Sequence, residues 1–241
     1  MMSTYYCGCC ESLLREFLPG GAEYPAILQY DIVGMGRREN KNCPVCGSND
    51  RERMVTLFLK KFILSEDFSE LKMLHMAPEH VLREILAKDK RIKYVKGDNF
   101  SEGYSYPDTL HVDITRAPFE DQYFDFIICN HVLEHIEDDT AAIRELYRIL
   151  KPGGRAILQV PISEKLKKTY ENKKVKTTEM KIKYFGQRNH VRIYAWDYLH
   201  RLAWAGFQTQ VFSFDQLYGA YFMKSRGLNE REKIIFCSKP L

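Results

Sequence analysis

The sequence lacks the features that would place it in a membrane, a secretory route or a repeat architecture. No apolar run approaches the ~18 residues that span a bilayer. The N-terminal stretch MMSTYYCGCC lacks the basic segment and apolar run of a secretory leader. No internal repeat or low-complexity segment is present. We therefore expect a cytoplasmic protein without membrane contacts, whose seven cysteines are free or metal-bound instead of forming disulfides.

A strong excess of one charge is missing as well, because 36 Lys and Arg against 32 Asp and Glu leave a net charge of +4. With 241 residues, 45% of them hydrophobic, the chain is long enough for one large domain, or one domain with a small module. The basic residues are unevenly placed, with eight lysines against three glutamates between Glu164 and Lys183. Such a run is usually a solvated loop; the alternative is an electropositive cover over an anionic substrate or RNA.

Four of the cysteines form two Cys-x-x-Cys pairs, Cys7 with Cys10 and Cys43 with Cys46. Each pair presents two thiolates from one turn, and two such turns supply the tetrahedral four-sulfur site of structural zinc. Cys9 is a spare thiol that can replace Cys7 or Cys10. The alternatives are four unrelated thiols, or a redox pair, which belongs at a strand-to-helix turn that is not seen here. We predict one Zn²⁺ ion bound by the two pairs.

The rest of the chain alternates between apolar runs and amphipathic stretches. Strands are predicted at 71–76, 92–96, 110–112, 124–130, 156–160, 208–214 and 233–238, and helices at 54–64, after 79 to about 87, at 138–150 and at 195–205. This alternation predicts an α/β fold, an open and mostly parallel sheet with helices on both faces and an antiparallel edge strand. The predicted organisation is a small zinc-ribbon module over residues 1–53, followed by the α/β domain over residues 54–241.

Polar side chains gather where the predicted parallel strands end. Ligands of open α/β sheets bind outside the carboxyl ends of the strands, so the candidates are His75–Glu79, Asp98, Asp113 and Asn130–His135. Asp98 is suited to accept from ribose hydroxyls and Asp113 from an adenine amino group. Either aspartate alone has the alternative role of capping a turn. Together, at consecutive strand ends, they favour a nucleotide-like ligand.

The segment from Phe119 to Ile136, FEDQYFDFIICNHVLEHI, and its continuation from Glu145 to Gly154, ELYRILKPGG, resemble class I S-adenosylmethionine-dependent methyltransferases. They match the fourth strand, the fourth helix and the following turn of that family, and the resemblance covers roughly residues 71–238. It implies a Rossmann-like domain that binds S-adenosylmethionine and releases S-adenosylhomocysteine. The implied cofactor contacts are His75, Met76, Ala77, Pro78, Glu79, Asp98, Asp113, Ile114, Asn130, His131 and His135.

The sequence departs from this family at the loop after the first strand. The family has a Gly-x-Gly turn there, whereas this chain has His75-Met76-Ala77-Pro78-Glu79. Ala77 is small enough to replace the first glycine, but Glu79 stands where another glycine is usual. One interpretation is that the Glu79 carboxylate pairs with the ammonium group of the cofactor. The alternative is that Glu79 caps the following helix, whose dipole favours an acid in its first turn.

The acceptor side is predicted from the segment after the fifth strand of the domain. FGQ at 185–187 and HVRIY at 190–194, with the ribbon, resemble a bacterial subfamily that has a zinc-binding N-terminus. We expect residues 165–194 to form a lid over the strand ends. The predicted acceptor contacts are Gln187, His190, Arg192 and Tyr194, with the planar fork of Arg192 on an anionic acceptor.

Methyl transfer depends mainly on aligning the acceptor with the sulfonium, plus a base where the acceptor loses a proton. His131 and His190 are the candidate bases, although a structural role is the commoner fate of each. We expect a methyltransferase that acts on a small-molecule or saccharide acceptor, anionic in character, with O, N and C acceptors all left open. The alternatives are an RNA methyltransferase, which the scarcity of aromatic residues in the Lys-rich segment disfavours, and a non-catalytic module that binds the cofactor. The oligomeric state is not indicated.

Overall fold

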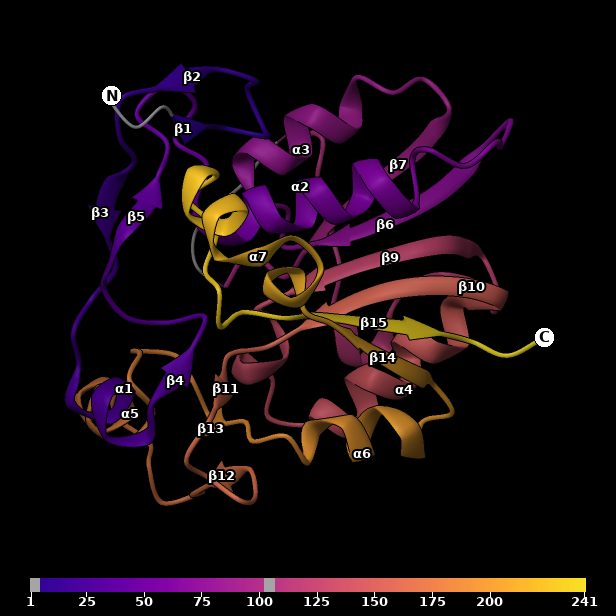
Figure 1. Cartoon of the computed structure of the whole chain (residues 1–241). Helices are drawn as coiled ribbons and strands as arrows, with labels where there is room; N and C mark the ends of the chain where they lie inside the picture. Colours follow the sequence, from indigo (N-terminus) through magenta and orange to yellow (C-terminus); the bar gives the residue numbers. More distant parts are fainter. Residues whose placement is uncertain (1–4, 102–106) are drawn as a thin grey trace.

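A seven-stranded sheet forms the centre of the computed structural model, which describes residues 5–101 and 107–241 (Figure 1). Its order is β14-β15-β10-β9-β6-β7-β8. The bounds are β6 Leu71–Met76, β7 Ile92–Asp98, β8 Leu110–His111, β9 Phe124–Asn130, β10 Leu150–Gln159, β14 Gln208–Phe212 and β15 Ile234–Ser238. The strand pairs from β10 to β8 are parallel, and β15 runs antiparallel to both β10 and β14. The predicted open, mostly parallel sheet is therefore confirmed, with the antiparallel strand one position in from the edge.

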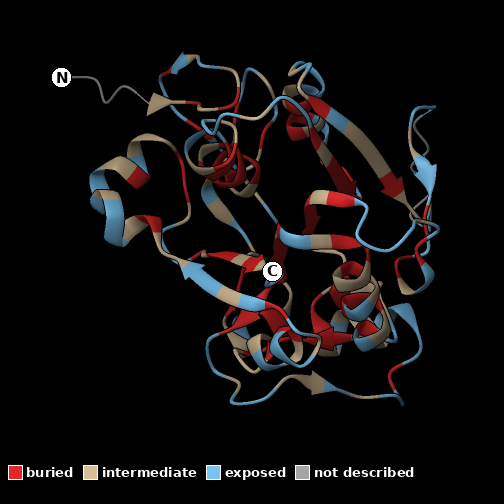
Figure 2. Cartoon of the chain, turned by 90° about the vertical axis from the view of Figure 1, so that its right-hand side faces the viewer, coloured by how far each residue is buried: buried red, intermediate tan, exposed pale blue. Residues whose placement is uncertain are grey.

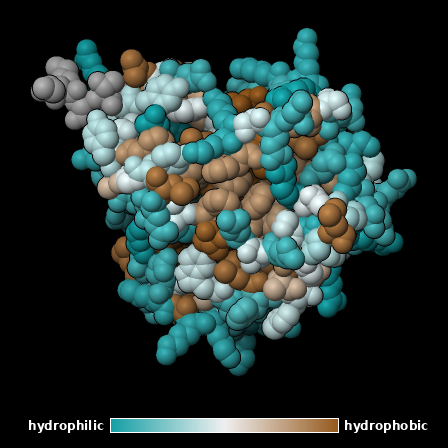
Figure 3. All heavy atoms as spheres, turned by 45° about the vertical axis from the view of Figure 1, so that its right-hand side comes forward, coloured by the Kyte–Doolittle hydropathy of each residue, from teal (hydrophilic) through white to brown (hydrophobic). Residues whose placement is uncertain are grey.

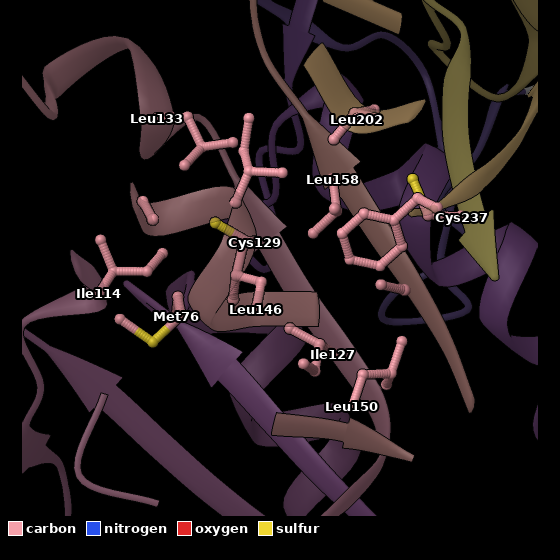
Figure 4. Close-up of a cluster of buried hydrophobic side chains, with 14 of the residues drawn as sticks. Met76, Ile114, Ile127, Cys129, Leu133, Leu146, Leu150, Leu158, Leu202 and Cys237 are labelled. Carbon is pink, nitrogen blue, oxygen red and sulfur yellow. The ribbon is translucent and has the colours of Figure 1, made fainter. Parts of the chain in front are cut away.

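Helices cover both faces of this sheet, as the alternating pattern predicted. One face is covered by α2 Asp50–Phe62, α3 His80–Ala87 and α7 Phe214–Ser225, and the other by α4 Asp139–Ile149 and α6 Tyr198–Trp204. Figure 4 shows the second interface, where Ile127 and Cys129 of β9 lie near Leu146 of α4. The buried residues are concentrated on the central strands and the helix faces that meet them (Figure 2).

Helix α2 begins four residues earlier than predicted because Asn49 caps it. The Asn49 side chain accepts a hydrogen bond from the Glu52 backbone N–H, and the Glu52 carboxylate accepts one from the Asn49 N–H, which makes a capping box. The other Glu52 oxygen accepts from the Val81 N–H at the start of α3. One acidic side chain thus joins the ends of two helices beside the sheet.

The last two strands are not a simple hairpin, because α7 lies between them. Its sequence is rich in aromatic residues and contains Gly219, whose φ of 77° interrupts the helix, so its intrinsic helix propensity is low. Phe214 and Met223 are nevertheless buried in the same apolar cluster as Phe58 of α2. Tertiary packing outweighs local propensity here.

The N-terminal residues divide between two places, as the indigo segments of Figure 1 show. Around the cysteines lie β1 Tyr5–Tyr6, β2 Leu13–Leu14, β3 Leu18–Gly20 and β5 Arg38–Asn42, with β1 paired to β2 and β3 to β5. Between β3 and β5, the chain forms α1 Pro25–Tyr30 and β4 Ile32–Val33. Strand β4 pairs with β11 Ile162–Ser163 and α1 packs against α5 Thr178–Phe185. The connection between the two cysteine pairs therefore reaches the segment after β10.

That segment, residues 162–193, is folded and not a solvated loop. Besides β11 and α5 it contains β12 Tyr170–Glu171, paired with β13 Arg192–Ile193. Ile27, Val175, Phe185 and Ile193 form a small buried cluster under it. We call residues 162–193 the insertion. Most of its lysines are exposed.

No helix of residues 5–101 or 107–241 has the length and apolar character needed to cross a membrane. The face in Figure 3 is mostly covered by hydrophilic side chains, with hydrophobic residues visible near its middle.

Candidate functional site

The two Cys-x-x-Cys turns come together beside β1 and β5. The Sγ atoms of Cys7 and Cys46 lie 3.8 Å apart, and those of Cys10 and Cys43 lie at the same distance. Four sulfurs at 2.3 Å from one tetrahedral ion would be separated by about 3.8 Å, so this donor set fits Zn²⁺. Cys9 is not one of the four, because its Sγ lies 3.3 Å from the Thr56 hydroxyl, although its thiol also interacts with that of Cys7. The four predicted cysteines are the four that meet.

A first cavity, of about 120 Å³, opens at the carboxyl ends of β6, β7 and β9, and we call it the strand-end cavity. Six of the predicted cofactor residues line it: Met76, Ala77, Asp98, Ile114, His131 and His135. The other five, His75, Pro78, Glu79, Asp113 and Asn130, are not among its lining residues. Six of the eleven residues predicted to contact the cofactor therefore meet at one cavity, and five do not.

The turn after β6 takes the shape that glycine would favour, although no glycine is present. Ala77 has a φ of 47°, in the left-handed region. Its N–H donates to the Gly97 carbonyl at 2.7 Å, which holds the turn against β7. Alanine has the smallest side chain after glycine, so it leaves the backbone of this turn accessible from the strand-end cavity. The positive φ of Ala77 adds some backbone strain.

Glu79 is the N-cap residue of α3, but its side chain points to partners on β6 and β9. Its Oε2 lies 2.7 Å from Nε2 of His75, and its Oε1 accepts from Nδ2 of Asn130 at 3.2 Å. The Glu79 side chain makes no capping hydrogen bond to α3. Burial is the largest single influence and opposes ionisation, but the hydrogen bond and charge of His75, together with the charge of Arg51, outweigh it and lower the pKa of Glu79 to about 2. Glu79 therefore holds the ends of β6 and β9 together.

The two strand-end aspartates differ in their surroundings. Asp98 lines the cavity, and its Oδ1 accepts from the Phe100 N–H at 2.6 Å. Asp113 is exposed, and its Oδ1 accepts from the N–H and the hydroxyl of Thr115 at 2.9 and 2.7 Å, which begins the short helix η1 Ile114–Arg116. These hydrogen bonds lower the pKa of Asp113. Asp113 has the capping role that was its alternative.

A second cavity, of about 300 Å³, adjoins the first and shares His131 and His135 with it. We call it the junction cavity, because the N-terminal segment, α2, the turn after β9 and the insertion all contribute to it. Gln187 and His190 line it, as predicted for the acceptor side. A Cβ atom at Gly34 would lie 2.9 Å from Cε1 of His131, so the backbone approaches that imidazole closely. Two cations, Lys41 and Arg51, also line it.

The wall between the cavities is rich in buried ionisable groups. Glu134, in the short helix η2 Leu133–His135, is 1% exposed, and neither carboxylate oxygen has a hydrogen-bond partner among the described residues. Burial raises the pKa of Glu134 to about 8. Burial also lowers the pKa of His131 and of His190 well below the usual range.

Arg192 and Tyr194 require a correction, because both side chains are used inside the protein. The Arg192 guanidinium donates to the carbonyls of Leu133, Ile136 and Glu137 and to the Glu171 carboxylate. Tyr194 is fully buried, and its hydroxyl lies 2.6 Å from Oδ2 of Asp139. Neither residue lines the two cavities. Arg192 braces the η2 turn from behind, so it does not face an acceptor.

Gly34, Lys41 and Arg51 are among the contributors to the junction cavity that the sequence prediction did not include. All three come from the N-terminal 53 residues, which the cysteine spacing suggested were only a zinc module. Arg51 lies in the first turn of α2, and its Nε is 3.6 Å from Oε1 of Glu79. No short motif marks these residues, because their proximity to His131 is created by the tertiary fold.

Comparisons with known proteins relate the region that forms the sheet to methyltransferases. Residues 71–158 match the family model for a methyltransferase domain. The chain is 40% identical over 65 residues to the ubiquinone/menaquinone biosynthesis C-methyltransferase UbiE of Vibrio parahaemolyticus, which is 26% of this chain and 25% of that protein. It is 46% identical over 46 residues to the demethylmenaquinone methyltransferase of Streptomyces griseus, 19% and 20% of the two lengths. The chain thus spans about a quarter or less of the curated relatives it matches.

Among solved structures, the [4+2]-cyclase SpnF is similar with a TM-score of 0.52 and 16% identity, over 79% of this chain and 82% of that one. At this identity the likeness concerns the fold. The reaction has to be inferred from the site.

Proposed function

We propose that this chain, whose residues 71–158 match the family model for a methyltransferase domain, is a class I S-adenosylmethionine-dependent methyltransferase that transfers a methyl group from that cofactor to a small, anionic acceptor. The observation that carries the proposal is the pair of adjoining cavities that share His131 and His135. S-adenosylmethionine would occupy the strand-end cavity, with its ribose at Asp98. The acceptor would enter the junction cavity.

The charges of the junction cavity support an anionic acceptor. Lys41 and Arg51 line it, and Arg51 supplies a planar fork suited to carboxylate or phosphate. Gln187 adds an amide, whose Nε2 lies 3.1 Å from Oδ1 of Asn189. A cavity of about 300 Å³ has the size of a small-molecule site. A small metabolite or a saccharide therefore suits it better than a nucleic-acid strand.

His131 is the side chain that we expect beside the transferred methyl group, because it borders both cavities. Its φ of 54° and the close approach of Gly34 fix its position. Alignment of this kind is the main contribution that a protein makes to methyl transfer. His190 lies on the acceptor side only.

The cysteine cluster is proposed as a structural Zn²⁺ site that shapes the same cavity. Cys43 follows directly on β5, and the buried Arg53 of α2 donates to the carbonyls of Asn40, Lys41 and Ser48 around that turn. Zinc at the cysteines would therefore fix the segment that carries Lys41. Structural zinc contributes directly to folding.

A transfer screen tests the reaction. The full chain is incubated with radiolabelled S-adenosylmethionine and, separately, with a pool of anionic metabolites, phenols and nucleotide sugars and with total RNA. We expect label in the small-molecule pool and none in RNA. For the acceptor found, Gln187→Ala should raise KM, whereas the triple change Lys173→Ala, Lys174→Ala and Lys176→Ala in the exposed insertion should not.

Two outcomes contradict the proposal. Label in RNA that the triple lysine variant abolishes would favour an RNA methyltransferase. Tight binding of S-adenosylhomocysteine without transfer to any pool would favour a binding module.

A further inference from the structure

A carboxylate and two imidazoles from distant parts of the chain meet in the wall of the junction cavity. Glu134 and His135 belong to η2, after β9, and His190 belongs to the insertion. Their ligand atoms, one from each residue, all lie within 4.8 Å of one another. Oε1 of Glu134 is 3.9 Å from Nε2 of His135 and 3.9 Å from Nε2 of His190. The two imidazole rings are T-shaped, with their centroids 4.7 Å apart.

Independent of the reaction proposed above, we propose that Glu134, His135 and His190 bind a divalent transition-metal ion of the zinc type. One carboxylate with two imidazoles is a donor set known from three-ligand metal sites that keep one coordination position open. This site is separate from the cysteine cluster.

Burial gives a reason for an ion at this position. Glu134 is 1% exposed, and neither of its oxygens has a hydrogen-bond partner in the described part of the chain. A buried carboxylate without a partner is costly, and a bound cation removes that cost. His190, 3% exposed, also turns its Nε2 toward the same carboxylate.

The spacing is close to what a metal requires. Tetrahedral ligands at 2.0–2.1 Å from zinc are separated by about 3.4 Å, so each Glu134–His distance of 3.9 Å would shorten by about half an ångström on binding, and no pair of the ligand atoms, all within 4.8 Å of one another, would need to shorten by more than about 1.4 Å. Hydrogen bonds already hold the backbone that carries these ligands. The Val191 N–H donates to the Glu134 carbonyl at 2.9 Å, and Arg192 donates to the carbonyls of Leu133 and Ile136 on either side.

Neighbouring groups complete the surroundings. His131 places its Nδ1 3.4 Å from Oε1 of Glu134 and can orient that carboxylate from outside the ligand set. Glu134, His135 and His190 all line the junction cavity. An open coordination position there would face the same space as Lys41 and Arg51, and an oxygen-bearing, anionic molecule would be its natural occupant.

The test is a metal titration of the full chain with Co²⁺, after the resident metal has been quantified by elemental analysis. Thiolate ligands give Co²⁺ a near-ultraviolet charge-transfer band, and carboxylate and imidazole ligands give only visible ligand-field bands. We expect a total of two metal ions per chain, of which the one outside the cysteine cluster lacks the thiolate band.

Glu134→Gln and His190→Ala should each weaken binding of that second ion at least about tenfold without changing the thiolate band. His200→Ala, which removes an exposed histidine of α6, is the matched control and should leave both ions in place. Circular dichroism reports whether each variant folds. The stoichiometry of the wild-type chain decides the question even if a variant does not fold.

Three results would overturn the inference. They are a wild-type chain that never exceeds one metal ion, a second ion that carries a thiolate band, and a second ion that Glu134→Gln and His190→Ala bind as tightly as the wild-type chain does. The first of these would indicate that Glu134 is simply protonated.

Discussion

Replacing Asp98 tests the assignment of the strand-end cavity most directly. Oδ1 of Asp98 is engaged by the Phe100 N–H at 2.6 Å, which leaves Oδ2 for a ligand in the cavity. Hydrogen bonds to a charged group contribute about 1.5–3 kcal/mol. Asp98→Ala should therefore weaken binding of S-adenosylhomocysteine by roughly 10- to 150-fold, because each 1.4 kcal/mol is a factor of ten in Kd. Isothermal titration calorimetry measures this change.

Two further variants make the result specific. Asp98→Asn keeps an oxygen for the Phe100 N–H but loses the charge, so its Kd should lie between the wild-type value and that of Asp98→Ala. Asp121→Ala removes an aspartate whose side chain is 73% exposed, just before β9 at the opposite end of the sheet, and should leave Kd unchanged. A Kd for Asp98→Ala within twofold of the wild-type value, in a folded protein, would refute the assignment.

Three other predictions follow from the structure. Cys43→Ser should lower the zinc content by one ion per chain and loosen the N-terminal strands more than the sheet, which elemental analysis and hydrogen exchange can show. Arg192→Lys should lower Tm by about 3–10 °C, because lysine cannot reproduce the contacts of the guanidinium with three carbonyls and Glu171; an unchanged Tm with an altered acceptor KM would restore its substrate role. Glu79→Gln should lower the free energy of unfolding by about 3 kcal/mol at pH 7. Folding depresses the pKa of Glu79 from 4.5 to about 2, so the stability difference between the wild-type chain and Glu79→Gln should shrink as the pH falls from 4.5 to 2. Urea unfolding at several pH values measures this difference, and a difference that does not change with pH would contradict the prediction.

The sheet was predictable because its signals are local. Strand β9 is a nearly continuous apolar run, and β6 carries another, as parallel strands buried on both faces require. The helix after β9 has a capping aspartate, Asp138, at its start. Helix α7 was missed because its aromatic residues and Gly219 do not carry helix propensity, and only burial against α2 makes it helical.

The strand-end cavity was also predictable in part, for a topological reason. Residues that follow parallel strands share one edge of the sheet, so Ala77, Asp98 and His131 had to lie near one another. Sequence alone does not say which side chains turn into the cavity. Glu79 and Asp113 illustrate this limit. The Glu79 carboxylate is hydrogen-bonded to His75, and the Asp113 carboxylate is hydrogen-bonded to Thr115.

The junction cavity was harder to predict from the sequence than the strand-end cavity. Its walls come from four segments that the sequence keeps apart, and their meeting depends on two weak pairings, β4 with β11 and α1 with α5. Gly34, which follows β4, lies against His131, and His190 of the insertion lies against Glu134. Residues 1–53 therefore do more than bring the four cysteines together, since they supply Lys41 and Arg51 to the junction cavity. A change that removes the cysteine-bound metal should consequently impair acceptor binding before it impairs cofactor binding, because Asp98 and Ala77 stand on the sheet and Lys41 does not.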